Sequence, residues 1–96
     1  MSATLLTVLV YDVSSDRRRT RLHAMLKEYG VPVQLSAFEA RLTQREREQL
    51  LRRASKLLDP AADRFVMYTI TTAQEERIAV VGMPRPQIEV PRYYIV

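Results

Sequence analysis

The segment that decides the fold is Leu5–Arg19, which reads LLTVLVYDVSSDRRR. Its first half, Leu5–Asp12, is almost entirely apolar and contains several β-branched residues, which predicts a strand in the middle of a sheet. Polar residues follow at once at positions 14–16, and their side-chain oxygens can cap a helix. The chain therefore begins with a buried strand that leads directly into a helix.

The rest of the chain supplies a second helix and further strands. The first helix should run over residues 17–29, with Gly30 as its stop. Residues 31–42 are extended, with either a bulge or a tight bend between two short strands. Thr43–Glu46, TQRE, is a capping box that opens the second helix, and Asp59-Pro60 ends it. Further strands are expected over residues 64–71, 78–81 and 88–96.

Each predicted helix carries one apolar stripe. In the second helix this stripe consists of Leu50, Leu51, Ala54, Leu57 and Leu58. Such helices pack economically on one face of an antiparallel sheet, so the fold class is α+β, a ferredoxin-like sandwich. Residues 1–82 should form this core domain. Residues 83–96 should form a linker and a C-terminal strand that serves in dimerisation, since Pro91 restricts that strand to pairing on one side.

Composition limits the classes of function. A chain of 96 residues has a small core, which favours a homodimer. The sequence has no cysteine, which fits a cytoplasmic protein, and no apolar run of about 18 residues that could span a membrane. The net charge is +4, and 13 of the 15 basic residues are arginines. Because the arginine fork matches phosphate, nucleic acid is the expected partner.

Asp12 is the candidate for chemistry because it ends the apolar strand directly before a helix. A carboxylate there can bind a hard cation such as Mg²⁺, which prefers oxygen ligands. One carboxylate makes a poor site, and two copies related by a two-fold axis would make a better one. Alternatively, Asp12 only caps the turn that follows it.

The arginines of the first helix are the candidate phosphate ligands, since the N-terminus of a helix also attracts anions. They are Arg17, Arg18, Arg19 and Arg21. The alternative is a solvated helix face balanced by neighbouring acidic residues. His23 is the only histidine, so a zinc site or a Ser-His triad within one chain is not expected.

Several short motifs together resemble the Cas-two family of CRISPR-associated proteins over roughly residues 5–82. In chain order they are Val8-Leu-Val-Tyr-Asp12, Leu26-Lys-Glu-Tyr-Gly30, Val33-Gln-Leu-Ser-Ala-Phe-Glu39 and Leu58-Asp-Pro60. The resemblance implies a ferredoxin-like homodimer in which the last strand of one chain extends the sheet of the other. It also implies a role in spacer acquisition, where the dimer bridges the CRISPR integrase subunits.

The resemblance assigns roles to individual residues. Asp12 falls on the family's functional aspartate, and the two copies of it in the dimer would hold Mg²⁺. Tyr11, Arg17, Arg19 and Phe38 fall on supporting positions. The expected function is thus a Mg²⁺-dependent endonuclease of RNA or duplex DNA.

Two other functions stay open. The chain could be a non-catalytic DNA-binding scaffold that bridges the integrase, with Asp12 vestigial. It could also be a ferredoxin-like regulatory module for a small ligand. The excess of arginine and the lack of a glycine-lined pocket count against this last function.

Overall fold

The structure is a computed structural model that describes residues 3–86 and 88. From β1 to β4 its strands and helices follow the order that the sequence predicts, whereas the short helix after β4 was not predicted. In chain order they are β1 (Leu5–Asp12), α1 (Asp16–Leu26), β2 (Gly30–Gln34), β3 (Ala37–Leu42), α2 (Gln44–Leu57), β4 (Arg64–Ile70) and the short α3 (Thr72–Glu75). No helix among the described residues is long and apolar enough to cross a membrane.

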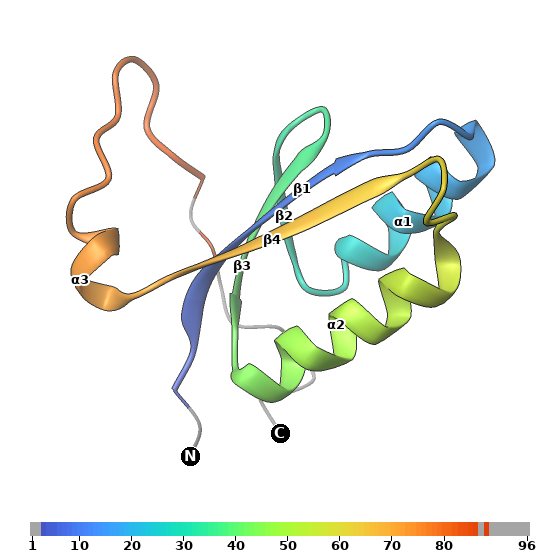
Figure 1. The fold of residues 1–96 in the computed structure, drawn as a ribbon. Helices are drawn as coiled ribbons and strands as arrows, with labels where there is room; N and C mark the ends of the chain where they lie inside the picture. The colour runs from blue at the N-terminus through green and yellow to red at the C-terminus, as the bar shows by residue number, and fades with distance from the viewer. Residues whose placement is uncertain (1–2, 87, 89–96) are drawn as a thin grey trace.

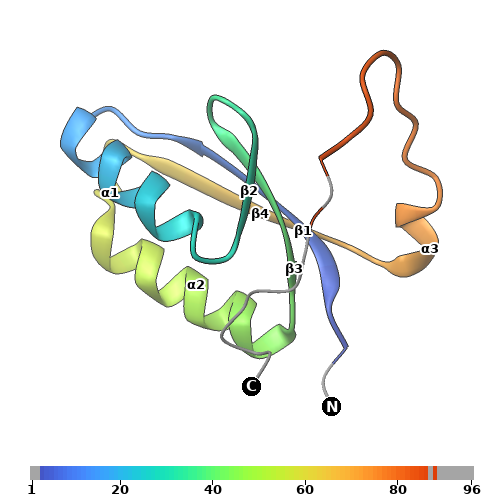
Figure 2. The same ribbon diagram turned by 180° about the vertical axis from the view of Figure 1, so that it is seen from behind.

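The described strands form one antiparallel sheet in the order β2-β3-β1-β4. The two strands that follow the helices, β2 and β4, thus lie at the two edges of this sheet. Both long helices, α1 and α2, lie together on one face of it (Figures 1 and 2). This order and layering confirm the ferredoxin-like α+β sandwich.

The core lies between the helices and the sheet. Leu9 of β1 stands between Phe38 of β3 and Met67 of β4 in the register, and Leu9 and Phe38 are completely buried. The helices contribute the buried side chains of Leu22, Met25, Leu26, Leu50 and Ala54. Burial of each large apolar side chain stabilises the fold by about 1.5–3 kcal/mol relative to exposure.

The opposite face of the sheet is not covered by α1 or α2. Side chains alternate between the two faces of a strand, so Val10 of β1 and Tyr68 of β4 point to this open face. They are 37% and 57% exposed. At the far end of this face, α3 and the segment after it are held by ion pairs of Arg41 with Glu75 and of Glu39 with Arg85. The open face is thus apolar and exposed near the end of β1.

Helix α1 is shorter than predicted, because it ends at Leu26 and residues 27–29 form a turn. Gly30 is not its cap. It is the first residue of β2, where a Cβ atom would lie 2.2 Å from the carbonyl oxygen of Glu39 on β3. Gly30 is therefore required by the close approach of two strands, which local sequence does not reveal.

Of the other expectations, one is confirmed, two are wrong and one lies almost entirely outside the described residues. The extended stretch is indeed two strands, β2 and β3, with an irregular register between Pro32 and Gln34. Leu51 was expected in the buried stripe of α2 but is 45% exposed, because Leu50 beside it takes the place that faces the sheet. Residues 78–81 are not a strand, and the predicted strand 88–96 lies outside the described residues except for Ile88.

Candidate functional site at the end of strand β1

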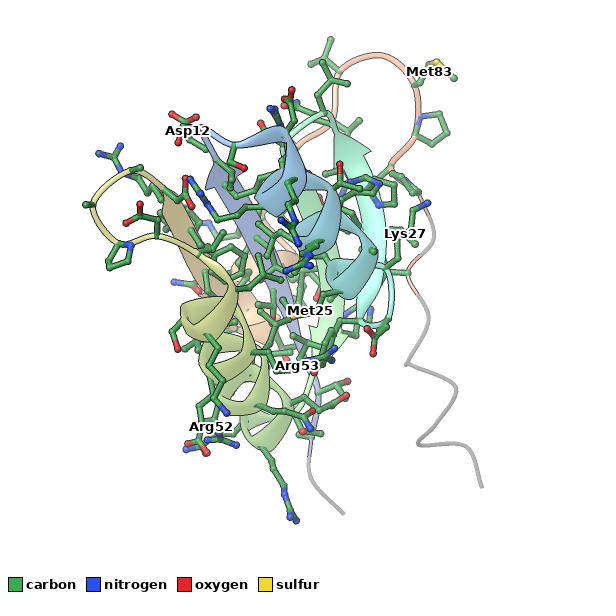
Figure 3. All side chains as sticks on the ribbon, turned by 90° about the vertical axis from the view of Figure 1, so that its right-hand side faces the viewer. Asp12, Met25, Lys27, Arg52, Arg53 and Met83 are labelled. Carbon is green, nitrogen blue, oxygen red and sulfur yellow. The ribbon has the colours of Figure 1, made fainter. Side chains whose placement is uncertain are left out.

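Asp12 is the last residue of β1 and stands opposite Arg64, the first residue of β4. Its side chain is exposed and lies where β1 leads into α1 (Figure 3). Alternation along the strand places it on the same face of the sheet as Val10. Among the described residues, the Asp12 carboxylate has no hydrogen-bond or ion-pair partner. Both of its oxygens are therefore available to a ligand.

The alternative prediction for Asp12 was that it caps the turn after β1. In the structure, other residues cap this turn. The hydroxyl of Ser15 accepts a hydrogen bond from the Arg18 amide at 3.2 Å and so caps α1. The Ser14 amide donates to the carboxylate of Asp63 at 3.1 Å. The described residues thus give the capping role to Ser15 and Asp63, and a functional role of Asp12 stays a prediction.

An open hollow of about 500 Å³ lies beside Asp12, lined by Val10, Tyr11, Asp12, Val13, Arg19 and Ser36. The structure therefore brings Arg19 and Asp12 to the same hollow. Arg19 donates to Asp16 at 2.8 Å, and the Asp16 side chain is 98% exposed. Such exposed ion pairs contribute little to stability, so Arg19 can exchange Asp16 for a phosphate at small cost.

Tyr11 lines this hollow and makes several hydrogen bonds there. Its amide donates to the carbonyl of Ser36 at 3.1 Å, and its hydroxyl donates to the carbonyl of Leu35 at 3.2 Å. The same hydroxyl lies 3.3 Å from Nδ1 of His23. Burial raises the pKa of Tyr11, and nearby Arg19 partly opposes that effect. Tyr11 thus stays protonated at neutral pH and ties the β2–β3 turn to the end of β1.

Phe38 lies in the core beneath these residues. It is completely buried, and its ring centre is 5.0 Å from that of His23 and 6.4 Å from that of Tyr11. Phe38 is therefore placed to hold Tyr11 and His23 in position, as a supporting residue would, and not to contact a ligand.

The four arginines predicted to bind nucleic acid point to different surroundings. Arg17 and Arg21 are exposed, and neither has an ion-pair partner among the described residues. Arg18 donates two hydrogen bonds to Asp63, at 2.7 and 3.1 Å, so its guanidinium is already engaged. Arg19 alone lines the hollow beside Asp12. A contact of each arginine with phosphate remains a prediction.

Sequence reasoning missed Asp63. Its side chain is completely buried, and hydrogen bonds from Arg18 hold its pKa well below the usual range of a carboxyl group. The available signal, an aspartate directly before the first residue of β4, is too common to indicate such a role. Asp63 stands close to the end of β1 only because β4 pairs with β1.

The oxygen donors near the end of β1 decide how the chain could hold Mg²⁺. Asp12 offers two free carboxylate oxygens, the ligand type that Mg²⁺ prefers. Among the described residues there is no group of three or more His, Cys, Asp or Glu side chains that could hold a metal. Asp12 therefore fits half of a site that needs a second copy of the chain or several water ligands.

Comparisons with known proteins place this chain beside one family. Residues 5–78 match the family described as CRISPR associated protein Cas2. The CRISPR-associated endoribonuclease Cas2 3 of Chloroflexus aurantiacus is 36% identical over 92 residues, which cover 96% of this chain and 98% of that protein. The CRISPR-associated endonuclease Cas2 2 of Thermus thermophilus is 42% identical over 79 residues, 82% of this chain and 87% of that protein.

Solved structures show the same arrangement. The crystal structure of a hypothetical protein, TT1823, from Thermus thermophilus has a TM-score of 0.75 and 38% identity, and the match covers 90% of this chain and 99% of that one. Streptococcus pyogenes Cas2 has a TM-score of 0.70 at 23% identity, which supports the fold alone, over 81% of this chain and 100% of that one. With a family match over most of its length and relatives above 30% identity, this chain belongs to the CRISPR-associated Cas2 family.

Proposed function

We propose that this protein is a Mg²⁺-dependent endonuclease that cleaves RNA or duplex DNA as a homodimer in CRISPR spacer acquisition. The observation that carries the proposal is the free, exposed carboxylate of Asp12 beside Arg19 in an open hollow. The names of the similar proteins from Chloroflexus and Thermus, an endoribonuclease and an endonuclease, support the same chemistry.

Each residue of the site has a part in this function. Asp12 of the two copies would hold Mg²⁺, which when bound supplies positive charge that stabilises charge developing on the phosphate. Arg19 releases Asp16 and orients the phosphate through its planar fork. Arg17 and Arg21, which are exposed one turn apart on α1, hold the neighbouring backbone of the nucleic acid.

A cleavage assay of the Asp12→Asn variant tests this proposal. Single-stranded RNA and duplex DNA are each incubated with the parent and the variant, with and without Mg²⁺. We expect the variant to lose Mg²⁺-dependent cleavage of the substrate that the parent cleaves, because the amide does not provide a charged oxygen. Its melting temperature should stay close to the parent's, since Asp12 has no partner to lose among the described residues.

The matched control is Glu48→Gln, which removes one exposed carboxylate on α2. This control should cleave like the parent. Parent-level cleavage by Asp12→Asn would rule out the catalytic role. A large drop in its melting temperature would instead show that Asp12 stabilises the turn.

The second candidate function is a non-catalytic scaffold that holds DNA and bridges an integrase. It is favoured by the single carboxylate of the site and by a fold match to a partial Cas6-RT-Cas1–Cas2 complex, with a TM-score of 0.65 and 23% identity, over 80% of this chain and 90% of that one. A scaffold binds duplex DNA without cleaving it, so the parent's own activity in the assay above separates the two functions.

Both functions require arginine contacts with phosphate, which a salt titration measures. Such contacts release counterions, so the logarithm of affinity falls linearly with the logarithm of salt concentration. We expect Arg17→Ala and Arg19→Ala to weaken duplex DNA binding regardless of sequence. Each should lower the slope by about 2, because each contact counts about 1 and a dimer presents every arginine twice.

Arg77→Ala is the matched control, since Arg77 is exposed and follows α3, away from α1. It removes one positive charge and should leave the slope near that of the parent. If Arg17→Ala and Arg19→Ala also keep the parent's affinity and slope, α1 is a solvated face and the path of the DNA lies elsewhere.

A further inference from the structure

The side chain of Asp63 is completely buried, and its carboxylate accepts five hydrogen bonds. The donors come from three separate segments of the chain. Oδ1 accepts from the Ser14 amide at 3.1 Å, the Ser14 hydroxyl at 3.2 Å and Nη2 of Arg18 at 3.1 Å. Oδ2 accepts from Nε of Arg18 at 2.7 Å and from the Asp59 amide at 2.9 Å. One side chain thus joins the β1–α1 turn, the first turn of α1 and the loop after α2.

This carboxylate holds the backbone that follows Asp12 and directly precedes the residue opposite it. Ser14, which Asp63 binds directly, follows Asp12 by two residues. Arg64, the residue after Asp63, stands opposite Asp12 in the β1–β4 register. The Asp12 side chain itself has no partner among the described residues, so its position depends on the backbone that carries it.

We propose that Asp63 is a positioning residue for Asp12, an inference that rests on the proposed function. With its five hydrogen bonds it holds the end of β1 and the start of α1 in one arrangement. The Asp12 carboxylate then meets the metal, and its counterpart in the second copy, at a fixed place. Residues that orient a ligand without touching the metal commonly change metal affinity about 10–100-fold when substituted.

The chemistry of the network predicts which substitution disrupts it. All five groups around Asp63 are donors, so an asparagine would satisfy only those that face its single oxygen. In either orientation its amide nitrogen would face two groups that can only donate, whereas the Ser14 hydroxyl could turn to accept. A glutamate would add a methylene group where the side chain is completely buried. Asp63→Asn therefore keeps the shape and removes the function of the network.

The decisive experiment compares Asp63→Asn with Glu75→Gln. Glu75 also accepts two hydrogen bonds from one arginine, Arg41, at 2.9 and 2.7 Å, but it lies on α3 at the other end of β1. Mn²⁺ binding is measured by calorimetry, and cleavage is measured at a temperature where both variants are folded. We expect Asp63→Asn to bind Mn²⁺ about tenfold or more weakly, with lower kcat and unchanged KM for the nucleic acid. Glu75→Gln should match the parent in all three.

The outcomes separate this proposal from the proposed function. Mn²⁺ affinity and kcat of Asp63→Asn equal to the parent's would overturn the positioning role while the nuclease stands. If the parent neither cleaves nor binds Mn²⁺, the nuclease proposal fails and amide hydrogen exchange of residues 12–15 decides the positioning role. Faster exchange in Asp63→Asn but not in Glu75→Gln supports it, and unchanged exchange overturns it.

A second variant covers the case in which Asp63→Asn does not fold. Arg18→Lys keeps the positive charge but cannot make both of the hydrogen bonds that the guanidinium donates to Asp63. It should weaken Mn²⁺ binding by a smaller factor than Asp63→Asn. Parent-like Mn²⁺ affinity in this variant would overturn the proposal.

Discussion

Gly30 illustrates how single residues decide the geometry around this site. The backbone of β2 approaches β3 so closely that a Cβ atom at position 30 would lie 2.2 Å from the Glu39 carbonyl oxygen and 2.7 Å from the Cβ of Ala40. No side chain fits there without a shift of one strand. The shift would be carried along β3, which also contains Phe38 beneath the candidate site.

Gly30→Ala should therefore destabilise the protein by about 1–3 kcal/mol, the usual cost of forcing atoms into a filled space. The clash is with backbone, so a side-chain rotation cannot relieve it. Urea denaturation followed by circular dichroism gives the midpoint for parent and variant. An unchanged midpoint would show that β2 can move away from β3 without loss.

Ion pairs connect the secondary-structure elements of this protein. Asp63, just before β4, binds Arg18 of α1, and Glu75 of α3 binds Arg41 of β3. In each pair the arginine's hydrogen bonds lower the pKa of the carboxyl group. The ionised carboxylates therefore stabilise the folded state relative to the unfolded one.

The pH dependence of stability follows from the direction of these shifts. An unfolded chain titrates its carboxyl groups near about pH 4, and the folded chain titrates Asp63 and Glu75 lower. Their contribution is present above about pH 4 and is lost as pH falls toward the folded values. Urea midpoints measured from pH 7 to pH 3 should fall steeply below about pH 4. Asp63→Asn should start lower at pH 7 and show a shallower fall, and equal slopes would contradict this origin.

Elements whose signals are local could be predicted from sequence, and those set by distant contacts could not. The apolar run of β1 and the capping box at Thr43 and Glu46 are local, and both are present. The role of Gly30 depends on β3 across the sheet, which is why the prediction that Gly30 stops the first helix was wrong. Asp12 could be named as a candidate because it ends a predicted strand, whereas the contacts of Asp63 depend on the pairing of β4 with β1.

At the scale of the whole molecule, the notable feature is the open face of the sheet, which α1 and α2 do not cover. Val10 and Tyr68 are exposed there, and Asp12 lies at its edge. A second copy placed on this face would cover the apolar side chains and bring the two Asp12 residues toward each other. This arrangement would satisfy both the predicted homodimer and the predicted Mg²⁺ site, and the strand 88–96 remains a further prediction for that interface.

If the predicted dimer forms through this face, Tyr68→Glu should convert it to monomers, because burying an unpaired carboxylate in an apolar interface is costly. The matched control is Leu51→Glu, since Leu51 is 45% exposed on α2, on the opposite side of the sheet. Sedimentation equilibrium over a range of concentrations gives the mass of each variant. A Tyr68→Glu protein that remains dimeric would move the interface away from this face.

The Asp63 network also sets an order of events during synthesis of the chain. Asp12, Ser14 and Arg18 emerge early from the ribosome, whereas Asp63 and Arg64 emerge late. Contacts between residues far apart in sequence form slowly, because a long loop must close first. A nascent chain that ends before residue 63 carries Asp12 without the hydrogen bonds around it. On the proposed function, a chain can therefore contribute a positioned Asp12 to a dimer only after its last described strand has docked on β1.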